Sequence, residues 1–206
     1  MKILSKKKKM LTTQGIEPDK LLRYHLILDI DETLIHSALG DEKTSIYLRP
    51  NLKFFLNYCY KHFNVGYWTL GTKKYCLHIL HKILTKDQFE RTKASSVIIS
   101  RCDEGNKYED VLRSHTFEVK KLDNHFTKPL QYLFDHPVYG HLFKKQNTLL
   151  IDNNPIVTAV NPHNSILIPS FYNDSSDNFL LMIIKWLEKV KGNLVKMEKP
   201  VFFVYK

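Results

Sequence analysis

The chain has 206 residues, of which 43% are hydrophobic and 25% are charged. These shares are ordinary for a folded protein and exclude a chain that is disordered throughout. Its three cysteines, Cys59, Cys76 and Cys102, have no close pair, which excludes a disulfide scaffold and a paired-thiol zinc site. No hydrophobic run approaches the roughly 18 residues of a membrane span. We therefore expect a soluble intracellular protein without a membrane anchor.

The net charge of +10 is distributed unevenly along the chain. Residues 1–25 hold seven Lys and Arg against two acids, which gives +5, and the remaining 181 residues supply the other +5. We expect residues 1–22 to form a basic leader, which is either a solvated tail or a nuclear address. The protein is then nuclear or cytoplasmic. Residues 23–206 are expected to form a single domain.

The first half of the chain alternates between strand and helix patterns. In chain order, these patterns predict a buried strand over 23–30, a brief strand over 46–48, a helix after Pro50, a strand over 65–70, a helix from Thr72 to about Leu84, and a strand over 97–100. Thr72 is a suitable residue to cap its helix. The polar stretch from about 100 to 127 is expected to be an insertion, with a strand near Thr116 and a small antiparallel sheet.

The second half continues the alternation. It predicts a helix over 129–134, a strand over 148–152, a short helix over 155–160, a strand over 165–168 and a closing helix over 178–190. Strands that alternate with helices are typical of a mostly parallel sheet covered on both faces. We therefore expect an α/β fold in three layers.

Three hydrophobic strands end in polar residues, which we expect to meet at the carboxyl edge of the sheet. Asp29 and Asp31 follow the first strand, Thr69 lies at the end of the second, and Asp152 and Asn153 end another. Residues two apart on extended backbone point the same way, so Asp29 and Asp31 are expected to repel each other. One can then act as a general acid while the other stays charged as a nucleophile. Such an oxygen-rich site also suits Mg²⁺.

The motifs HLILDIDETLIHS, YLRPNLKFFL, VGYWTLGTKKY, TKPLQYLF and NTLLIDNNPIVTAVNPHNSILIPSF follow one another in this order. Together they resemble the haloacid dehalogenase superfamily, and within it the RNA polymerase II carboxy-terminal-domain phosphatases, the NLI-interacting-factor-like branch. The resemblance runs from about His25 to Val190. It implies a Rossmann-like three-layer sandwich with a central parallel sheet, in which a small insertion replaces a large cap.

The resemblance also implies roles for individual residues. Asp29 matches the nucleophile that forms an aspartyl-phosphate, and Asp31 matches the general acid and base. Thr69 matches a hydroxyl that binds phosphoryl oxygens, and Lys128 matches the lysine that neutralises charge in the transition state. Phosphoryl transfer depends mainly on such positioning and charge stabilisation.

Further matches concern the metal and the loops around the site. Mg²⁺ is expected among Asp29, the carbonyl of Asp31 and Asn153, with Asp152 nearby through water. Thr33 is expected to shape the loop after the first strand and to belong to the phosphate-binding set. Arg49 either supports this loop or touches the substrate, and the sequence favours neither role.

Three positions need comment. Asn51 stands where the family commonly has glycine, and asparagine tolerates unusual backbone angles. The last motif reads Asp152-Asn153 rather than Asp-Asp, as in the small members of this branch. Lys120 also lies in a context like that of the family's lysine, but Lys128 is closer to Asp152 in the chain and we favour it.

These observations predict a Mg²⁺-dependent phosphatase that acts on phosphoserine or phosphothreonine in a protein substrate. The polymerase tail as substrate follows from the resemblance alone. Nucleic acid is not expected as a direct ligand, and we expect a monomer. Two alternatives stay open, a phosphatase of small molecules or nucleic-acid ends and a non-catalytic protein-binding module with the same fold.

Overall fold

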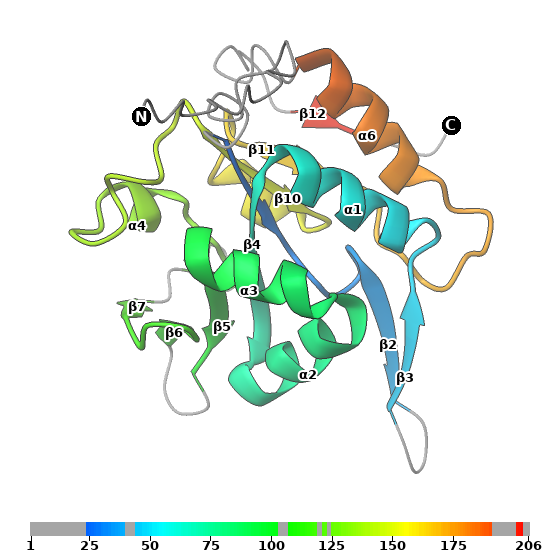
Figure 1. Cartoon of the computed structure of the whole chain (residues 1–206), viewed down its shortest axis with the longest axis horizontal. Helices are drawn as coiled ribbons and strands as arrows, with labels where there is room; N and C mark the ends of the chain where they lie inside the picture. Colours follow the sequence, from blue (N-terminus) through cyan, green and yellow to red (C-terminus); the bar gives the residue numbers. More distant parts are fainter. Residues whose placement is uncertain are drawn as a thin grey trace, which may run out of the picture.

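The computed structural model describes residues 24–39, 44–102, 107–118, 121–122, 125–190 and 201–203. Among them, an eight-stranded sheet crosses the molecule in the order β12-β11-β10-β1-β4-β5-β6-β7 (Figure 1). Its strands are β1 (His25–Leu28), β4 (Asn64–Thr72), β5 (Ile98–Arg101), β6 (Lys107–Asp110), β7 (Thr116–Glu118), β10 (Thr148–Asp152), β11 (Ser165–Leu167) and β12 (Val201–Phe202). The strands from β12 to β5 are parallel, and β6 and β7 continue the sheet antiparallel. This confirms the expected α/β class.

The register of the central strands places the carboxyl ends of β1 and β10 level, while β4 continues past them to Thr72. Leu28, the last residue of β1, pairs with Ile151 of β10 and with Tyr67 of β4. One residue further along these strands come Asp29 and Asp152. The sheet therefore brings the polar strand ends to one edge, as predicted.

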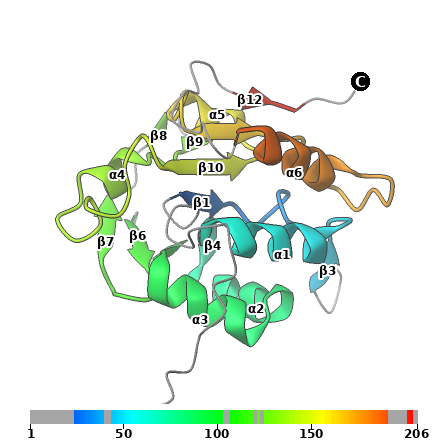
Figure 2. The same ribbon diagram turned by 45° about the horizontal axis from the view of Figure 1, so that its top comes forward.

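Helices cover both faces of the sheet. One face carries α1 (Leu52–His62), α2 (Lys73–Ile83), α3 (Lys86–Ser95) and α6 (Phe179–Val190), with α1 and α6 side by side (Figure 2). The other face carries α4 (Gln131–Phe134) and α5 (Pro155–Ala159). Because side chains alternate along a strand, Leu26 and Leu28 enter the core below the first helix group while Ile27 enters the second core.

Local polar contacts fix where the helices begin. The Thr72 hydroxyl accepts a hydrogen bond from the Tyr75 amide at 3.4 Å, as its position predicted. Thr85 and Gln88 form a reciprocal capping box at the start of α3. Asn51 has a φ of 65°, the left-handed conformation that asparagine tolerates where the family commonly has glycine.

Two elements lie outside the sequence prediction. Helix α3 was not predicted, and the brief strand near 46–48 is part of a hairpin of β2 (Ile35–Leu39) and β3 (Thr44–Leu48). Within the region expected to be an insertion, β6 and β7 extend the main sheet, and β8 (Lys121–Leu122) pairs with β9 (His125–Phe126) in a separate small sheet.

Some predictions fall on parts of the chain that the structure does not describe. The leader over 1–22 and Lys120 lie outside the described residues, so the domain boundary and the nuclear address remain predictions. The monomeric state also remains a prediction. Among the described residues, no helix combines the length and the hydrophobicity needed to cross a membrane.

Candidate active site

A buried lysine joins the two central strand ends. The Lys128 ammonium donates hydrogen bonds to Oδ1 of Asp29 and, at 2.8 Å, to Oδ2 of Asp152. All three side chains are almost fully buried. The backbone also connects these strand ends, because the Asp29 amide donates to the Ile151 carbonyl at 3.0 Å. The structure therefore brings together the predicted nucleophile Asp29, the predicted lysine Lys128 and Asp152 from the predicted metal-binding set.

The charges in this cluster hold one another in place. Burial by itself would lower the pKa of Lys128, but the carboxylates of Asp152 and Asp29 outweigh burial and raise it, so the ammonium stays charged. Burial raises the pKa of the Asp152 carboxyl, and the Lys128 ammonium opposes that rise. A fixed cation beside Asp29 is well placed to neutralise negative charge that approaches this carboxylate.

Asp31 is held by two hydroxyl donors from β4 and α2. Thr69 Oγ1 donates to Oδ2 of Asp31 at 3.1 Å, and the Tyr75 hydroxyl donates to Oδ1. Burial, which outweighs these hydrogen bonds, raises the pKa of Asp31, and the nearby Asp29 charge adds to the rise. The shift favours the protonated carboxyl, the form that a general acid requires.

The loops after β1 and β10 are tied together by side chains. Thr33 Oγ1 donates to Asn153 Oδ1 at 3.1 Å, and the Asn153 amide donates to Ser170 Oγ at 2.8 Å. Thr33 is fully buried. This contact matches the loop-shaping role expected for Thr33 and gives its hydroxyl no direct access to a substrate.

Arg49 is buried and occupied by structural partners. Its guanidinium forms two hydrogen bonds with Asp177, of 2.9 and 2.7 Å, and donates to the carbonyls of Thr33 and Pro169. Both members of this ion pair are inaccessible to solvent. Of the two roles expected for Arg49, these contacts match support of the loop and not contact with substrate, because the guanidinium has no exposed face.

The polar groups open into a cleft of about 190 Å³ at the edge of the sheet. It is lined by Asp29, Asp31, Leu70, Lys128, Asp152, Asn153, Asn154 and Val157. Three carboxyl groups face one ammonium in this lining, so the cleft carries excess negative charge when all of them are ionised. Apart from the lysine, the polar groups offered are mainly oxygens, the donors that Mg²⁺ prefers.

The donor set fits a magnesium ion that uses more than carboxylates. Among the described residues, no three His, Cys, Asp or Glu side chains converge closely enough to hold a metal by themselves. A cation at this edge would therefore also need the Asp31 carbonyl and the Asn153 amide oxygen, beside the Asp29 carboxylate. The resemblance implies this combination, with Asp152 nearby through water, and it stays a prediction.

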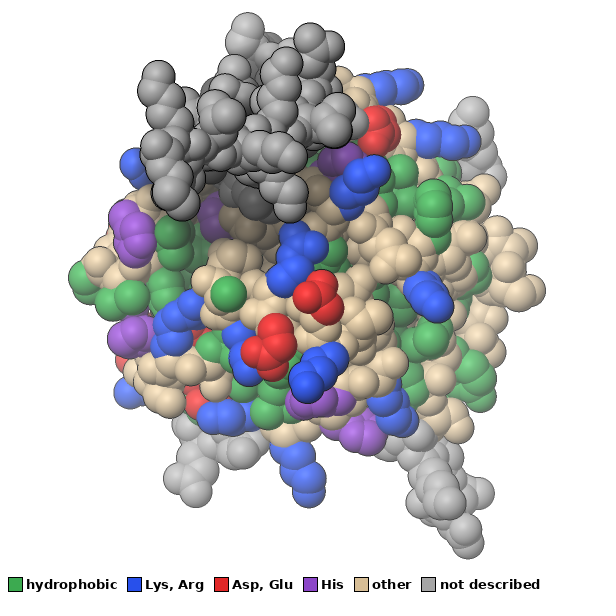
Figure 3. Space-filling model, viewed as in Figure 1, with side chains coloured by type: hydrophobic (Ala, Val, Ile, Leu, Met, Phe, Trp, Pro, Cys, Tyr) green, Lys and Arg blue, Asp and Glu red, His purple; other side chains and the backbone are tan. Residues whose placement is uncertain are grey.

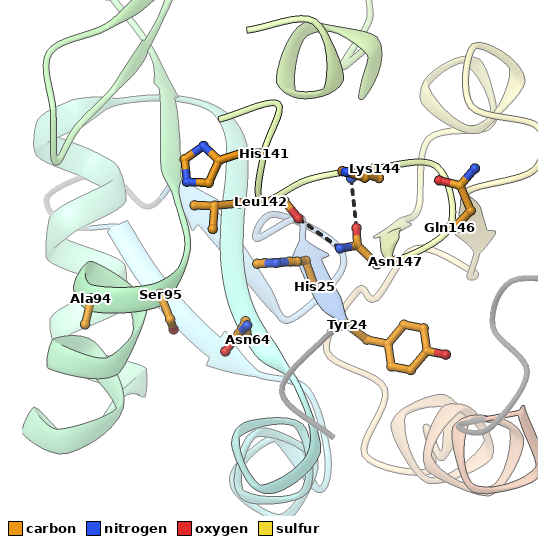
Figure 4. Close-up of a pocket in the computed structure, with 10 residues that line it drawn as sticks. All are labelled: Tyr24, His25, Asn64, Ala94, Ser95, His141, Leu142, Lys144, Gln146 and Asn147. Atoms are coloured by element: carbon orange, nitrogen blue, oxygen red, sulfur yellow. Dashed lines mark hydrogen bonds between the residues drawn. The ribbon is translucent and has the colours of Figure 1, made fainter. Parts of the chain in front are cut away.

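A larger cavity lies elsewhere and lacks this chemistry. It has a volume of about 660 Å³ and lies at the start of β1 and β4, at the opposite end of the sheet (Figure 4). Its lining includes His25, Asn64, His141 and Lys144 but no carboxylate. The smaller cleft, and not this cavity, holds paired acids with a buried lysine, so we place the candidate active site there.

Three residues at the site were missed by the sequence prediction. Tyr75 lies in the helix predicted after Thr72 and had no role in the predicted site, yet its hydroxyl reaches Asp31. Ser170 lies near the end of the last quoted motif, where no role was assigned to it, and Asp177 lies beyond that motif. A signal existed only for Tyr75, because the cap at Thr72 places the first turn of α2 beside the strand end that carries Thr69.

Comparison with known proteins identifies similar chains. The family model of the NLI interacting factor-like phosphatases matches residues 24–198. A protein of Invertebrate iridescent virus 3 described as CTD phosphatase-like, 355R, is 29% identical over 192 residues, which cover 81% of this chain and 96% of that protein. The ubiquitin-like domain-containing CTD phosphatase 1 of Xenopus laevis is 23% identical over 191 residues, 91% of this chain and 56% of that protein.

Two solved structures of the RNA polymerase II CTD phosphatase Fcp1 are also similar. Fission yeast Fcp1 bound to beryllium fluoride matches with a TM-score of 0.47 and 16% identity, over 86% of this chain and 52% of that one. A second Fcp1 structure matches with a TM-score of 0.49 and 19% identity, over 84% and 51%. The chain thus spans about half the length of these two structures.

Proposed function

The chain belongs to the family of NLI interacting factor-like phosphatases, and from this premise we propose that it is a Mg²⁺-dependent phosphatase that hydrolyses phosphoserine or phosphothreonine in proteins through an aspartyl-phosphate. The observation that carries the proposal is the pairing of two differently held aspartates at one strand end. Lys128 binds Asp29, while Thr69 and Tyr75 bind Asp31.

The environment of Asp29 supports its role as nucleophile. It accepts a hydrogen bond from the buried Lys128 ammonium, which holds one of its oxygens and fixes the side chain at the edge of the sheet. The carboxylate attacks phosphorus and forms the acyl-phosphate bond as the bond to the seryl or threonyl oxygen breaks. The same ammonium then stabilises the negative charge on the transferring phosphoryl group.

The environment of Asp31 supports a complementary role. Burial raises its pKa, a shift in the direction that a general acid requires, and it lines the same cleft as Asp29. Asp31 gives this proton to the leaving oxygen of the substrate. In the second step it takes a proton from the water that attacks the aspartyl-phosphate, which releases inorganic phosphate and restores Asp29.

Two further groups complete the site. The Thr69 hydroxyl donates to Asp31, which lines the cleft, so Thr69 lies directly behind the carboxyl that would face the phosphoryl group. A bound Mg²⁺, held by Asp29, the Asp31 carbonyl and Asn153 with Asp152 nearby, would supply positive charge that offsets the phosphate and the carboxylates. Thr33 keeps Asn153 oriented for this task.

A protein substrate is favoured by the small size of the elements beside the cleft. Among the described residues, β6 to β9 form short strands and no helical cap. An open site of this kind admits a phosphorylated segment of a protein more readily than an enclosed site, which suits small molecules. The two relatives named above are described as CTD phosphatase-like or as a CTD phosphatase, so the polymerase tail that the resemblance implies is the first substrate to test.

The direct test is hydrolysis of para-nitrophenyl phosphate and of a phosphoserine peptide by the purified chain, with Mg²⁺ or with excess chelator. We expect turnover of both substrates that requires the metal and disappears in Asp29→Asn. Metal-independent turnover would contradict the mechanism. A folded chain that turns over neither substrate would favour a non-catalytic binding module, and preference for nucleotide ends would favour the small-molecule alternative.

A further inference from the structure

A groove separate from the catalytic cleft runs across the helical face of the molecule. It consists of two adjoining hollows of about 540 and 260 Å³. Both are lined by the same four residues, Leu48 from the end of β3 and Leu52, Lys53 and Asn57 from α1. The first hollow continues to Phe54, and the second continues to the connection between α2 and α3. The shared lining makes the two hollows one continuous groove.

The groove exposes large hydrophobic side chains to solvent. Leu48 is 54% exposed and Phe54 is 60% exposed, and both lie at its rim. Ile83 and Leu84, at the end of α2, add further half-buried hydrophobic surface to the second hollow. Single exposed hydrophobic residues are common on protein surfaces, but several around one groove mark an interaction site.

The floor of the groove is rigid. Leu52 and Leu56 are buried in the core beneath it. Asn57 Oδ1 accepts a hydrogen bond from Gln88 Nε2 at 3.0 Å, which ties α1 to α3 across the second hollow. Gln88 is itself fixed by the capping box with Thr85. A preformed surface of this kind loses little conformational freedom when a partner binds.

The charged side chains that line the groove are all basic. Lys53 and Lys82 are exposed at its sides, and neither hollow is lined by an Asp or Glu. The first turn of α1 contains no acidic residue, so the positive end of its helix dipole also lies unopposed at the groove. Figure 3 shows this side of the molecule, over α1 and β3, with green hydrophobic side chains beside blue basic ones and no red among them. The nearest acid along the chain, Asp87, lies in the first turn of α3 and outside the lining.

We propose that this groove binds an acidic segment of a partner protein that inserts leucine or phenylalanine side chains between Lys53, Lys82 and the Leu48–Phe54 rim. The apolar lining is mainly aliphatic, which suits packing of such side chains more than the stacking of nucleic-acid bases. A second copy of the chain is disfavoured, because two copies that each carry a net charge of +10 repel one another.

The groove is connected to the active-site loops without being part of them. Arg49 lines the first hollow and donates to the carbonyl of Thr33, which follows the catalytic aspartates. None of the residues that line the groove lines the catalytic cleft. The groove can therefore hold a partner while the cleft stays open, and the inference does not depend on the proposed activity.

The test measures binding of synthetic peptides by fluorescence anisotropy. The probe alternates glutamates with leucine and phenylalanine anchors, and two control peptides carry lysine in place of glutamate or serine in place of the anchors. We expect the acidic apolar peptide to bind and each control peptide to bind at least about tenfold more weakly. Lys53→Glu and Phe54→Ser should each weaken binding by a similar factor, whereas Lys185→Glu on the exposed side of α6 should not.

Other outcomes would overturn the proposal. Equal binding of the lysine-bearing peptide, or binding that Lys53→Glu and Phe54→Ser leave unchanged, would show that the groove does not hold the acidic segment. Tighter binding of single-stranded oligothymidylate would assign the groove to nucleic acid, and a dimer that Phe54→Ser dissociates in sedimentation would assign it to a second copy. Thermal unfolding of each variant verifies folding, so the result can be interpreted even if the chain lacks phosphatase activity.

Discussion

Removal of Asp177 should strongly destabilise the fold, because it leaves the Arg49 guanidinium buried without its counter-ion. Both side chains are inaccessible to solvent, and two short hydrogen bonds join them. Loss of one partner from such a pair costs about 3–5 kcal/mol of unfolding free energy. Asp177 also accepts a hydrogen bond from the Phe179 amide at the start of α6, so the loss should lie in the upper part of this range.

The assay is urea and thermal unfolding of Asp177→Ala followed by circular dichroism. For a chain of this size, a loss of about 4 kcal/mol corresponds to a fall in Tm of roughly 10 °C. Asp174→Ala, in the exposed loop before Asp177, is the matched control and should unfold like the wild type. The double variant Arg49→Met with Asp177→Leu should recover much of the stability, because it buries no unpaired charge.

A loss of less than about 1 kcal/mol in Asp177→Ala would refute the assignment of Arg49 to loop support. A double variant that is stable but inactive would instead indicate that Arg49 also contacts the substrate.

Three further predictions concern single residues. Tyr75→Phe removes a donor from Asp31 and should lower kcat about tenfold with little change in KM or in Tm; an unchanged kcat would make the contact incidental. Lys128→Met should reduce turnover at least about 100-fold, and Lys120→Ala should not; the reverse result would reassign the lysine. Burial lowers the pKa of His25 to about 4 in the folded chain. As the pH falls below 6.5, His25 is therefore protonated in the unfolded chain, whereas in the folded chain it is protonated only near pH 4. Stability should therefore fall by up to about 3 kcal/mol across this window, and urea unfolding of His25→Gln should show a smaller fall.

The sheet was predictable because its strands are short hydrophobic runs with polar ends. The hairpin partner β2 was missed, since its sequence, IHSAL, mixes polar and hydrophobic residues and has no clear period. Helix α3 was missed because its residues are mostly polar. The spacing of Thr85 and Gln88 is that of a capping box, however, and could have indicated where the helix begins.

The candidate site was predictable where its residues follow strands. Asp29, Asp31 and Asp152 lie at strand ends whose parallel pairing forces them to one edge. The environment of Arg49 could not be predicted from the sequence, because its partner Asp177 lies 128 residues further along the chain and belongs to no motif. Contacts between distant loops depend on tertiary packing, which local patterns do not encode.

The most direct measurement of the central claim is detection of phosphate on Asp29. The Asp31→Asn variant should form the aspartyl-phosphate with an activated substrate such as para-nitrophenyl phosphate, whose leaving group needs no proton, and should hydrolyse it slowly. Acid quenching followed by mass spectrometry of proteolytic peptides should then show one added phosphoryl group on the peptide that contains Asp29. The same experiment with Asp29→Asn should show none. Phosphate on a different residue, or turnover retained in Asp29→Asn, would contradict the account.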